Sequence, residues 1–209
     1  MGLKVKVCGM TDPQNILSVA GAGPDYIGYI FYPLSPRWVG SDPDNSIFRN
    51  VPQTIQRVGV FVDAAPEFVI RTAISAGLNA VQLHGNESPQ VCRMIGAEGL
   101  SVIKVFGSEA VADSEKLNQY IGTADYFLFD TTTMQKGGSG RRFNWSVLGN
   151  YTIDKPFFLS GGIGPDDAEA VRNLANRGLY AVDINSRFEK KPGIKDAELV
   201  GLFIDKIKN

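Results

Sequence analysis

Eight short apolar runs, rich in β-branched and aromatic residues, recur along the whole chain. Each has the composition of a β-strand, and most of the intervals between them contain a segment with helix-like spacing. The runs are Leu3–Cys8, Asp25–Phe31, Arg57–Val62, Asn79–His84, Ser101–Phe106, Ala124–Asp130, Pro156–Ser160 and Tyr180–Asn185. They begin 22 to 32 residues apart. This spacing favours strand–helix units over hairpins, because two parallel strands need a crossover of a dozen or more residues.

Several expected helices have recognisable starts. Asp12-Pro13 and Ser88-Pro89 each offer a capping side chain followed by a proline in the first turn. Pro165, followed by two aspartates, predicts a helix that runs to about Arg177 and ends at Gly178.

The last helix is expected near Lys195 to Ile207, with Leu199, Leu202, Phe203 and Ile207 on its apolar stripe. Two segments are rich in Gly, Pro and Ser and predict only short helical pieces. They are Pro33–Gln53 and Thr131–Asn150.

An uninterrupted series of eight strand–helix units predicts the α/β class and favours a closed (β/α)8 barrel, the TIM barrel, over an open sheet. No linker or change of composition divides the chain, so we expect one domain over residues 1–209. In such a barrel, binding and catalytic residues lie at the C-terminal ends of the strands and in the loops that follow.

The overall charge excludes several classes of partner. A formal net charge of -1 produces no field that attracts nucleic acid or a membrane surface, so we expect neither partner. No run approaches the roughly 20 apolar residues of a membrane span, and Met1 to Cys8 lacks the apolar core of a signal peptide. With only two cysteines, Cys8 and Cys92, a disulfide framework is not expected, and the reducing cytoplasm is the predicted location.

Polar and glycine residues concentrate at the ends of the predicted strands. The ends or following loops carry Cys8-Gly9, Ser35-Pro36-Arg37, Asp63, His84-Gly85, Asp130, Ser160 to Gly164 and Asp183 to Arg187. The predicted helical faces carry nothing comparable. This asymmetry is what an enzyme built on a barrel produces.

The loops after strands seven and eight predict a phosphate site. Gly161 and Gly162 let backbone N–H groups approach an anion, Ile163 follows them, and the helix after Pro165 would add its positive end. From strand eight, Asn185 and Ser186 face the same region.

Seven sequence blocks, in order along the chain, resemble the phosphoribosylanthranilate isomerase family. They are Val7 to Thr11; Gly28 to Phe31 with Ser35-Pro36-Arg37; Val58 to Val62; Val81 to Gly85; Phe129-Asp130 with Gly137 to Gly140 and Phe143 to Trp145; Ser160 to Ile163; and Pro192 to Asp196. The blocks are spread from Val7 to Asp196, so the resemblance extends over nearly the whole chain.

The resemblance implies an Amadori rearrangement without metal or organic cofactor. In the family, N-(5′-phosphoribosyl)anthranilate becomes 1-(2-carboxyphenylamino)-1-deoxyribulose 5-phosphate. An acid protonates the ring oxygen and a base removes the proton at C2′. Carried over by motif, Asp130 is the general acid and Cys8 the general base, and Arg37 is the best candidate to pair with the anthranilate carboxylate.

Both catalytic groups need an altered pKa to work near neutral pH. Burial must raise the pKa of Asp130, and the pKa of Cys8 must fall from the usual thiol value of about 8.5. Strand alternation places Lys6 on the same face as Cys8, so we hypothesise that Lys6 favours the Cys8 thiolate. Asp183, at the end of strand eight, is the alternative acid, with an orienting or structural role if Asp130 is the acid.

Other residues receive secondary roles. His84, the single histidine, is expected to contact substrate or fix its loop, and one histidine does not make a metal site. Gly137 to Gly140, with Arg141 and Arg142, would form a mobile lid or simply a flexible loop. Arg187 adds charge to the phosphate site or points to solvent. Asp63 is expected to cap a loop, and Cys92 to pack in a helix.

Two rival functions stay open. One is the related aminoaldose-phosphate isomerase of histidine biosynthesis, although no internal repeat is visible and strand one ends in Cys8 where that family has a catalytic aspartate. The other is a non-catalytic phosphosugar-binding barrel, which would be expected to lose the acid or the base. Both a monomer and a homodimer are compatible with the sequence.

Overall fold

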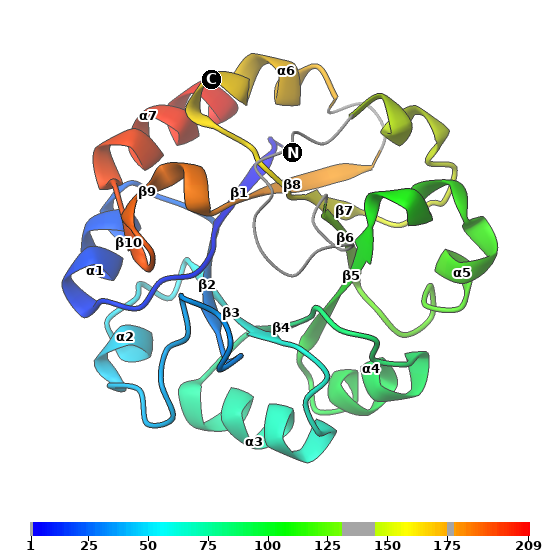
Figure 1. Ribbon diagram of the computed structural model, residues 1–209, viewed down its shortest axis with the longest axis horizontal. Coiled ribbons are helices and arrows are strands. Elements are labelled where there is room, and N and C mark those ends of the chain that lie inside the picture. Colours follow the sequence, from blue (N-terminus) through cyan, green and yellow to red (C-terminus); the bar gives the residue numbers. More distant parts are fainter. Residues whose placement is uncertain (1, 131–144, 175–177) are drawn as a thin grey trace.

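The computed structural model describes residues 2–130, 145–174 and 178–209. Eight parallel strands form a closed barrel in sequence order, and β1 pairs with β8 to complete the ring. The strands are β1 (Lys4–Val7), β2 (Tyr26–Ile30), β3 (Gln56–Phe61), β4 (Ala80–Leu83), β5 (Ser101–Gly107), β6 (Tyr126–Asp130), β7 (Phe157–Leu159) and β8 (Leu179–Ile184). Figure 1 looks along the barrel, with the helices on its outside. The predicted (β/α)8 barrel is confirmed, with every strand within two residues of its expected bounds.

Most of the helices connect successive strands of the barrel, and η4 and α7 follow β8. They are α1 (Pro13–Gly21), α2 (Ser46–Arg49), α3 (Pro66–Ala76), α4 (Pro89–Gly96), α5 (Ser114–Asn118), α6 (Ala168–Arg172) and α7 (Ala197–Lys208), with short 3-10 helices η1 (Ser108–Ala112), η2 (Trp145–Asn150), η3 (Pro165–Asp167) and η4 (Ser186–Phe188). Asp12 and Ser88 cap α1 and α4 by accepting hydrogen bonds from Asn15 N and Val91 N, as predicted.

Two helix predictions were wrong in detail. The helix expected from Pro165 to about Arg177 begins as a 3-10 turn and ends at Arg172. Asn173, a weak helix former, follows it directly. On α7 the buried stripe is formed by Val200, Phe203, Ile204 and Ile207, whereas Leu202 is 55% exposed.

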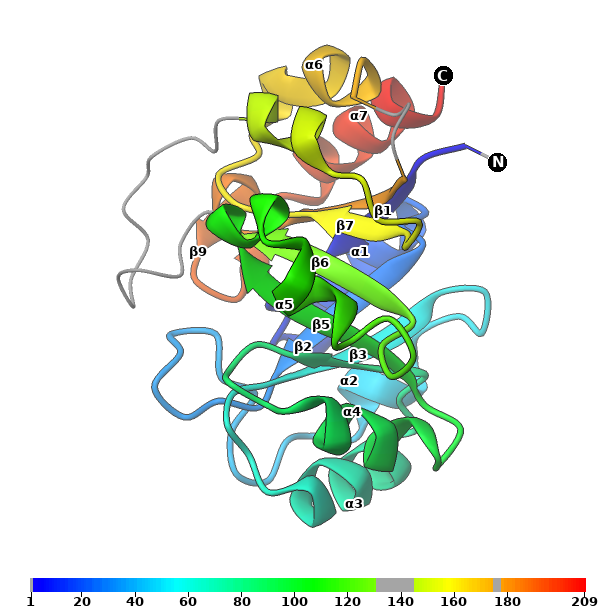
Figure 2. The same ribbon diagram turned by 90° about the vertical axis from the view of Figure 1, so that its right-hand side faces the viewer.

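A short hairpin follows β8 and was not expected from the sequence. It consists of β9 (Glu189–Lys191) and β10 (Ile194–Lys195), which pair antiparallel. Figure 1 shows it beside β1, between α1 and α7, and Figure 2 places β9 at the opposite end of the barrel from the two chain termini. The hairpin therefore lies at the end where the strands finish.

Two hydrophobic clusters divide the core. The larger packs the outer strand faces against the helices. The smaller fills the barrel interior and takes its residues from seven of the strands: Tyr26, Val58, Ala80, Ile103, Val105, Leu128, Phe158 and Ala181. Because successive side chains on a strand alternate between faces, residues two positions further along each strand also face the interior.

Candidate active site

Above the apolar interior lies a layer of polar side chains. Gln82 is two residues beyond Ala80 and Asp183 two beyond Ala181, so both face inward, and Lys6 is the register partner of Asp183. All three are buried. The next inward positions are Cys8, His84 and Asp130, which places the predicted base and acid on the interior wall where the strands end.

The Cys8 thiol is enclosed by backbone. Its residue is 4% exposed, and a Cβ atom added to Gly28 on the neighbouring strand would lie 2.8 Å from the Cys8 sulfur. Only glycine at position 28 leaves room for the thiol. Gly9 turns the chain with φ +76°, in the left-handed region that glycine adopts without strain.

The expectation of a lowered thiol pKa is not met. Burial is the largest effect and raises the pKa of Cys8, while Lys6 and Lys195 act to lower it and Asp183 acts to raise it. Lys6 thus acts in the hypothesised direction without outweighing burial. The sequence argument considered the cation and neglected the enclosure of the sulfur.

Lys6 is paired mainly with Asp183. Its Nζ lies 2.9 Å from Asp183 Oδ2, with both side chains almost fully buried. Burial alone would lower the pKa of Lys6, but the attraction of Asp183 and Cys8 outweighs it and raises this pKa. The pair therefore brings little net charge to the thiol, because ammonium and carboxylate largely cancel.

Asp130 lies at the interior end of β6 and is 7% exposed. His84 Nε2 is 3.5 Å from Asp130 Oδ2, and His84 Nδ1 is 3.4 Å from Gln82 Nε2. If the Gln82 amide donates to Nδ1, the neutral imidazole carries its proton on Nε2, directed at Asp130. His84 thus links the middle polar layer to the predicted acid.

Arg37 pairs with a residue that sequence reasoning missed. Its Nε and Nη2 donate to the two carboxylate oxygens of Glu189 at 2.8 and 2.7 Å. This bidentate geometry leaves Nη1 and the second N–H of Nη2 as the donors for another carboxylate. Arg37 therefore lies at the predicted end of the barrel, held by the hairpin.

Two of the predicted phosphate residues have left-handed backbone. Gly161 and Gly162 have φ of +93° and +72°, and Ile163 is buried beneath them. Ser186 is exposed at the start of η4. Asn185 precedes it and accepts a hydrogen bond from Lys195 Nζ at 2.6 Å through Oδ1.

The turn between Gly164 and Asp167 is closed by a side chain. Gly164 N donates to Asp167 Oδ2 at 2.8 Å, so the turn after Pro165 is closed by its own carboxylate. Arg187 extends past Gly164, where an added Cβ would meet Arg187 Cδ at 3.4 Å. Its exposed side chain is thus held beside the strand-seven loop.

A second buried charge pair orders the loop after β4. Lys104 Nζ is 2.9 Å from Glu87 Oε2, and Glu87 accepts from the backbone N–H groups of Asp63 and Gly85. Asp63 has φ +48° and accepts from Asn86 N, so its predicted loop role is confirmed. An alternation argument would have placed Lys104 on the outer face of β5, but nothing in the sequence identifies its partner.

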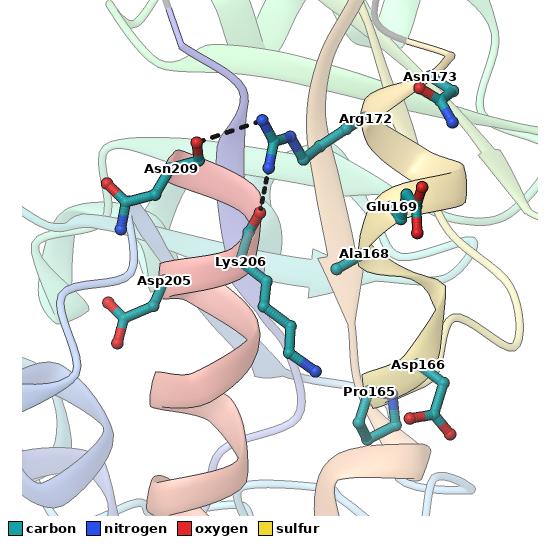
Figure 3. Close-up of a pocket in the computed structure, with 9 residues that line it drawn as sticks. All are labelled: Pro165, Asp166, Ala168, Glu169, Arg172, Asn173, Asp205, Lys206 and Asn209. Atoms are coloured by element: carbon teal, nitrogen blue, oxygen red, sulfur yellow. Dashed lines mark hydrogen bonds between the residues drawn. The ribbon is translucent and has the colours of Figure 1, made fainter.

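Where the structure describes them, the remaining candidate sites show no arrangement of side chains that suggests catalysis. Cys92 is buried in α4, as predicted, and burial raises its pKa to about 11. The described residues contain no group of three metal-ligating side chains. A groove between α6 and α7 (Figure 3) is bridged by Arg172, which donates to the carbonyls of Lys206 and Asn209. It contains none of the predicted site residues. The Gly137 to Gly140 loop lies outside the described residues.

Comparison with known proteins decides the family. The family model for N-(5'-phosphoribosyl)anthranilate (PRA) isomerase matches residues 5–206. The chain belongs to the phosphoribosylanthranilate isomerase family. It is 45% identical to the N-(5'-phosphoribosyl)anthranilate isomerase of Parabacteroides distasonis, with 98% of this chain and 90% of that protein covered. It is 41% identical to that of Phocaeicola vulgatus, with 98% and 97% covered.

Solved structures of the family share the fold. The phosphoribosylanthranilate isomerase of Thermotoga maritima superposes with a TM-score of 0.83 at 36% identity, covering 99% of this chain and 98% of that one. A phosphoribosylanthranilate isomerase in complex with reduced 1-(o-carboxyphenylamino)-1-deoxyribulose 5-phosphate gives 0.82 at 33% identity, with the same coverage. No helix in the described part of the chain is long and apolar enough to cross a membrane.

Proposed function

We propose that this chain catalyses the Amadori rearrangement of N-(5′-phosphoribosyl)anthranilate to 1-(2-carboxyphenylamino)-1-deoxyribulose 5-phosphate in tryptophan biosynthesis. The full-length family match supports this function. The observation that carries it is the presence of Cys8 and Asp130 at inward positions where β1 and β6 end, since a binding-only barrel has no need of both groups.

Asp130 is proposed to start the reaction. Its carboxyl proton passes to the ring oxygen of the ribose, the bond from that oxygen to C1′ breaks, and the nitrogen lone pair forms a Schiff base with C1′. His84, 3.5 Å away, holds the carboxyl group in place. Asp183 is the weaker candidate for the acid, because it is deeper in the barrel and engaged by Lys6.

Cys8 is proposed to complete the rearrangement. The thiolate removes the proton from C2′, the C2′ electrons form a double bond to C1′, and the C1′–N electrons return to nitrogen, giving an enolamine. The enolamine becomes the ketone when C1′ gains a proton and the 2′-hydroxyl loses one. Each turnover leaves a thiol and a carboxylate, so a proton must leave Cys8 and another must reach Asp130 before the next.

The substrate itself is proposed to span the mouth of the barrel. Its 5′-phosphate would lie on the backbone of Gly161 to Ile163 with Asn185 and Ser186, and its anthranilate carboxylate on Arg37. A related isomerase binds the reduced product analogue, which contains the same phosphate and carboxylate groups.

The test is the fluorescence decay of freshly generated phosphoribosylanthranilate. We expect rapid decay with the wild type and a loss of about 10²–10⁴-fold in kcat for Cys8→Ala and for Asp130→Asn. Cys92→Ala is the matched control, because it removes a buried thiol that lies on α4, outside the barrel interior. A wild type no faster than buffer would refute the proposed substrate, and the aminoaldose of histidine biosynthesis would be assayed next.

A further inference from the structure

The hairpin after β8 carries a buried cluster of charges that the mechanism above does not use. Glu189 accepts two hydrogen bonds from Arg37, one from Lys195 Nζ at 2.6 Å and one from Gly193 N at 3.1 Å. The side chains of Glu189 and Lys195 are 4% and 0% exposed. Most ion pairs form at the protein surface, so the burial of this pair calls for an explanation.

The cluster joins the two ends of the proposed substrate site. Glu189 holds Arg37, the proposed ligand of the anthranilate carboxylate. Lys195 donates to Asn185, a proposed ligand of the phosphate, as well as to Glu189. One buried carboxylate and one buried ammonium therefore connect two groups that would bind opposite ends of the same molecule.

The base lies against the same cluster. An added Cβ on Gly9, the residue after Cys8, would lie 2.6 Å from Arg37 Cδ and 2.9 Å from Asn185 Oδ1. A side chain at position 9 would therefore collide with Arg37 and Asn185, the two proposed ligands of the substrate. The positive charge of Lys195 also acts to lower the pKa of Cys8, although burial outweighs it.

The hairpin is fixed to the body of the barrel. Lys195 exchanges two backbone hydrogen bonds with the Asn15 side chain on α1, at 2.7 and 2.8 Å. Thr11 Oγ1 donates to Gly193 O. The hairpin is therefore a rigid support for Glu189 and Lys195.

The charges of the cluster do not balance. Arg37 and Lys195 are cations, and within the described part of the chain Glu189 is the carboxylate bonded to both, so these three side chains carry a surplus of one positive charge. Lys195 is fully buried and the Arg37 side chain is 19% exposed, so an anion bound beside them would offset the cost of withdrawing this charge from water. The proposed substrate carries a carboxylate and a phosphate, so it would place one anionic group near each cation.

We infer that Glu189 and Lys195 are positioning residues that set the distance between the carboxylate-binding Arg37 and the phosphate-binding Asn185. This inference rests on the proposed function. Glu189 directs the remaining Arg37 donors, and Lys195 bonds to the Asn185 amide oxygen, so the N–H₂ group is the part of Asn185 that would donate to the phosphate. The site would then favour substrates whose two anionic ends are separated by the distance between Arg37 and Asn185.

The first test is a double-mutant cycle on kcat/KM. Glu189→Gln should lower kcat/KM about 10- to 100-fold, mainly through KM, because displaced recognition groups of this kind cost about that much. In an Arg37→Met background the same change should have almost no further effect, since Glu189 acts through Arg37. A residue with only a structural role would reduce kcat/KM equally in both backgrounds, and that result would overturn the inference.

The second test measures binding without turnover. Titration of ribose 5-phosphate by calorimetry should show weaker binding to Lys195→Met than to wild type, and no additional loss when Asn185→Ala is already present. Equal affinity in wild type and Lys195→Met would refute the role of Lys195. This readout does not depend on the isomerase reaction, so failure of the proposed function and failure of this inference are distinguishable.

The matched control is Asp25→Asn at the other end of the barrel. Asp25 also accepts from two lysines and a backbone N–H, namely Lys4, Lys208 and Val5 N. The Asp25→Asn variant should be less stable than the wild type and should have an unchanged KM. If Glu189→Gln fails to fold, Glu189→Gln/Lys195→Met removes both charges together and leaves no lone ion between them. Unchanged KM in that double variant would equally overturn the inference.

Discussion

At the scale of single residues, the thiol of Cys8 is subject to opposing influences. Burial raises its pKa, Lys6 lowers it and Asp183 raises it. The proposed base must nevertheless become a thiolate during turnover. Neighbouring charges therefore matter more for Cys8 than for a solvated cysteine, because little water screens them.

Replacing Lys6 should raise the thiol pKa further. In a Cys92→Ala background, Lys6→Met should shift the thiolate absorbance titration of Cys8 to higher pH, because the cation is lost and the repulsion of Asp183 remains. Lys6→Met/Asp183→Asn should show a smaller shift, since both charges are then absent. A titration curve identical to that of the Cys92→Ala parent would contradict this account of Lys6.

The sequence predicted some of these residues and not others, for a physical reason. Cys8 and Asp130 lie where strands end and Asp183 lies one layer deeper, so strand alternation and barrel geometry place all three side chains in the barrel interior. Glu189 follows the last barrel strand in a segment with no helical or strand period, and Lys195 was expected at the start of the last helix, whereas it lies in β10. Their partners lie up to 180 residues away in the chain, and a pattern within one segment does not reveal such pairings.

At the scale of elements, the hairpin of β9 and β10 depends on its turn. Gly193 has φ +85°, and a side chain there would collide with Thr11. Its N–H also donates to Glu189. The turn thus combines a conformation suited to glycine with a close contact to the loop after β1.

Gly193→Ala should destabilise the protein and raise KM. We expect a loss of roughly 2–4 kcal/mol, from left-handed backbone strain and a steric clash together. Gly23→Ala is the control, because Gly23 has φ +75° but no neighbour within 4 Å of an added Cβ. Urea unfolding should show about 1 kcal/mol for Gly23→Ala, with unchanged KM. Equal losses in the two variants would refute the proposed contact.

Element boundaries were predictable where local chemistry determines them. Proline and capping side chains fix the starts of α1 and α4, and both predictions are confirmed. The helix after Pro165 was predicted five residues too long, because its charged start was clear and its end had only Gly178 as a signal. The irregular segment after β2 contains the short α2, as expected.

At the scale of the whole molecule, carboxylates at both ends of the barrel link stability to pH. Burial would raise the pKa of Glu189, but hydrogen bonds from Arg37 and Lys195 outweigh it and lower this pKa. At the other end, Lys4, Val5 N and Lys208 likewise lower the pKa of Asp25 against burial. In both cases the unfolded chain has the higher pKa and binds more protons in acid.

Stability should therefore fall as the pH drops below the ordinary values of 4.5 for Glu189 and 3.8 for Asp25. These two carboxylates contribute their full stabilising free energy at pH values above 4.5 and 3.8. That contribution is lost as the pH falls through their lower pKa in the folded protein. Urea unfolding at several pH values should show a shallower acid slope for Asp25→Asn/Glu189→Gln than for wild type. Parallel slopes would show that other groups control acid unfolding.

The pairing of Lys6 with Asp183 also matters while the chain is being synthesised. The two residues are 177 positions apart, so the ammonium leaves the ribosome long before its carboxylate partner does. A nascent barrel that closed early, without β8, would trap an uncompensated charge in its centre. Closure of the ring and neutralisation of Lys6 must then occur in one event, and this penalises premature collapse around an incomplete chain.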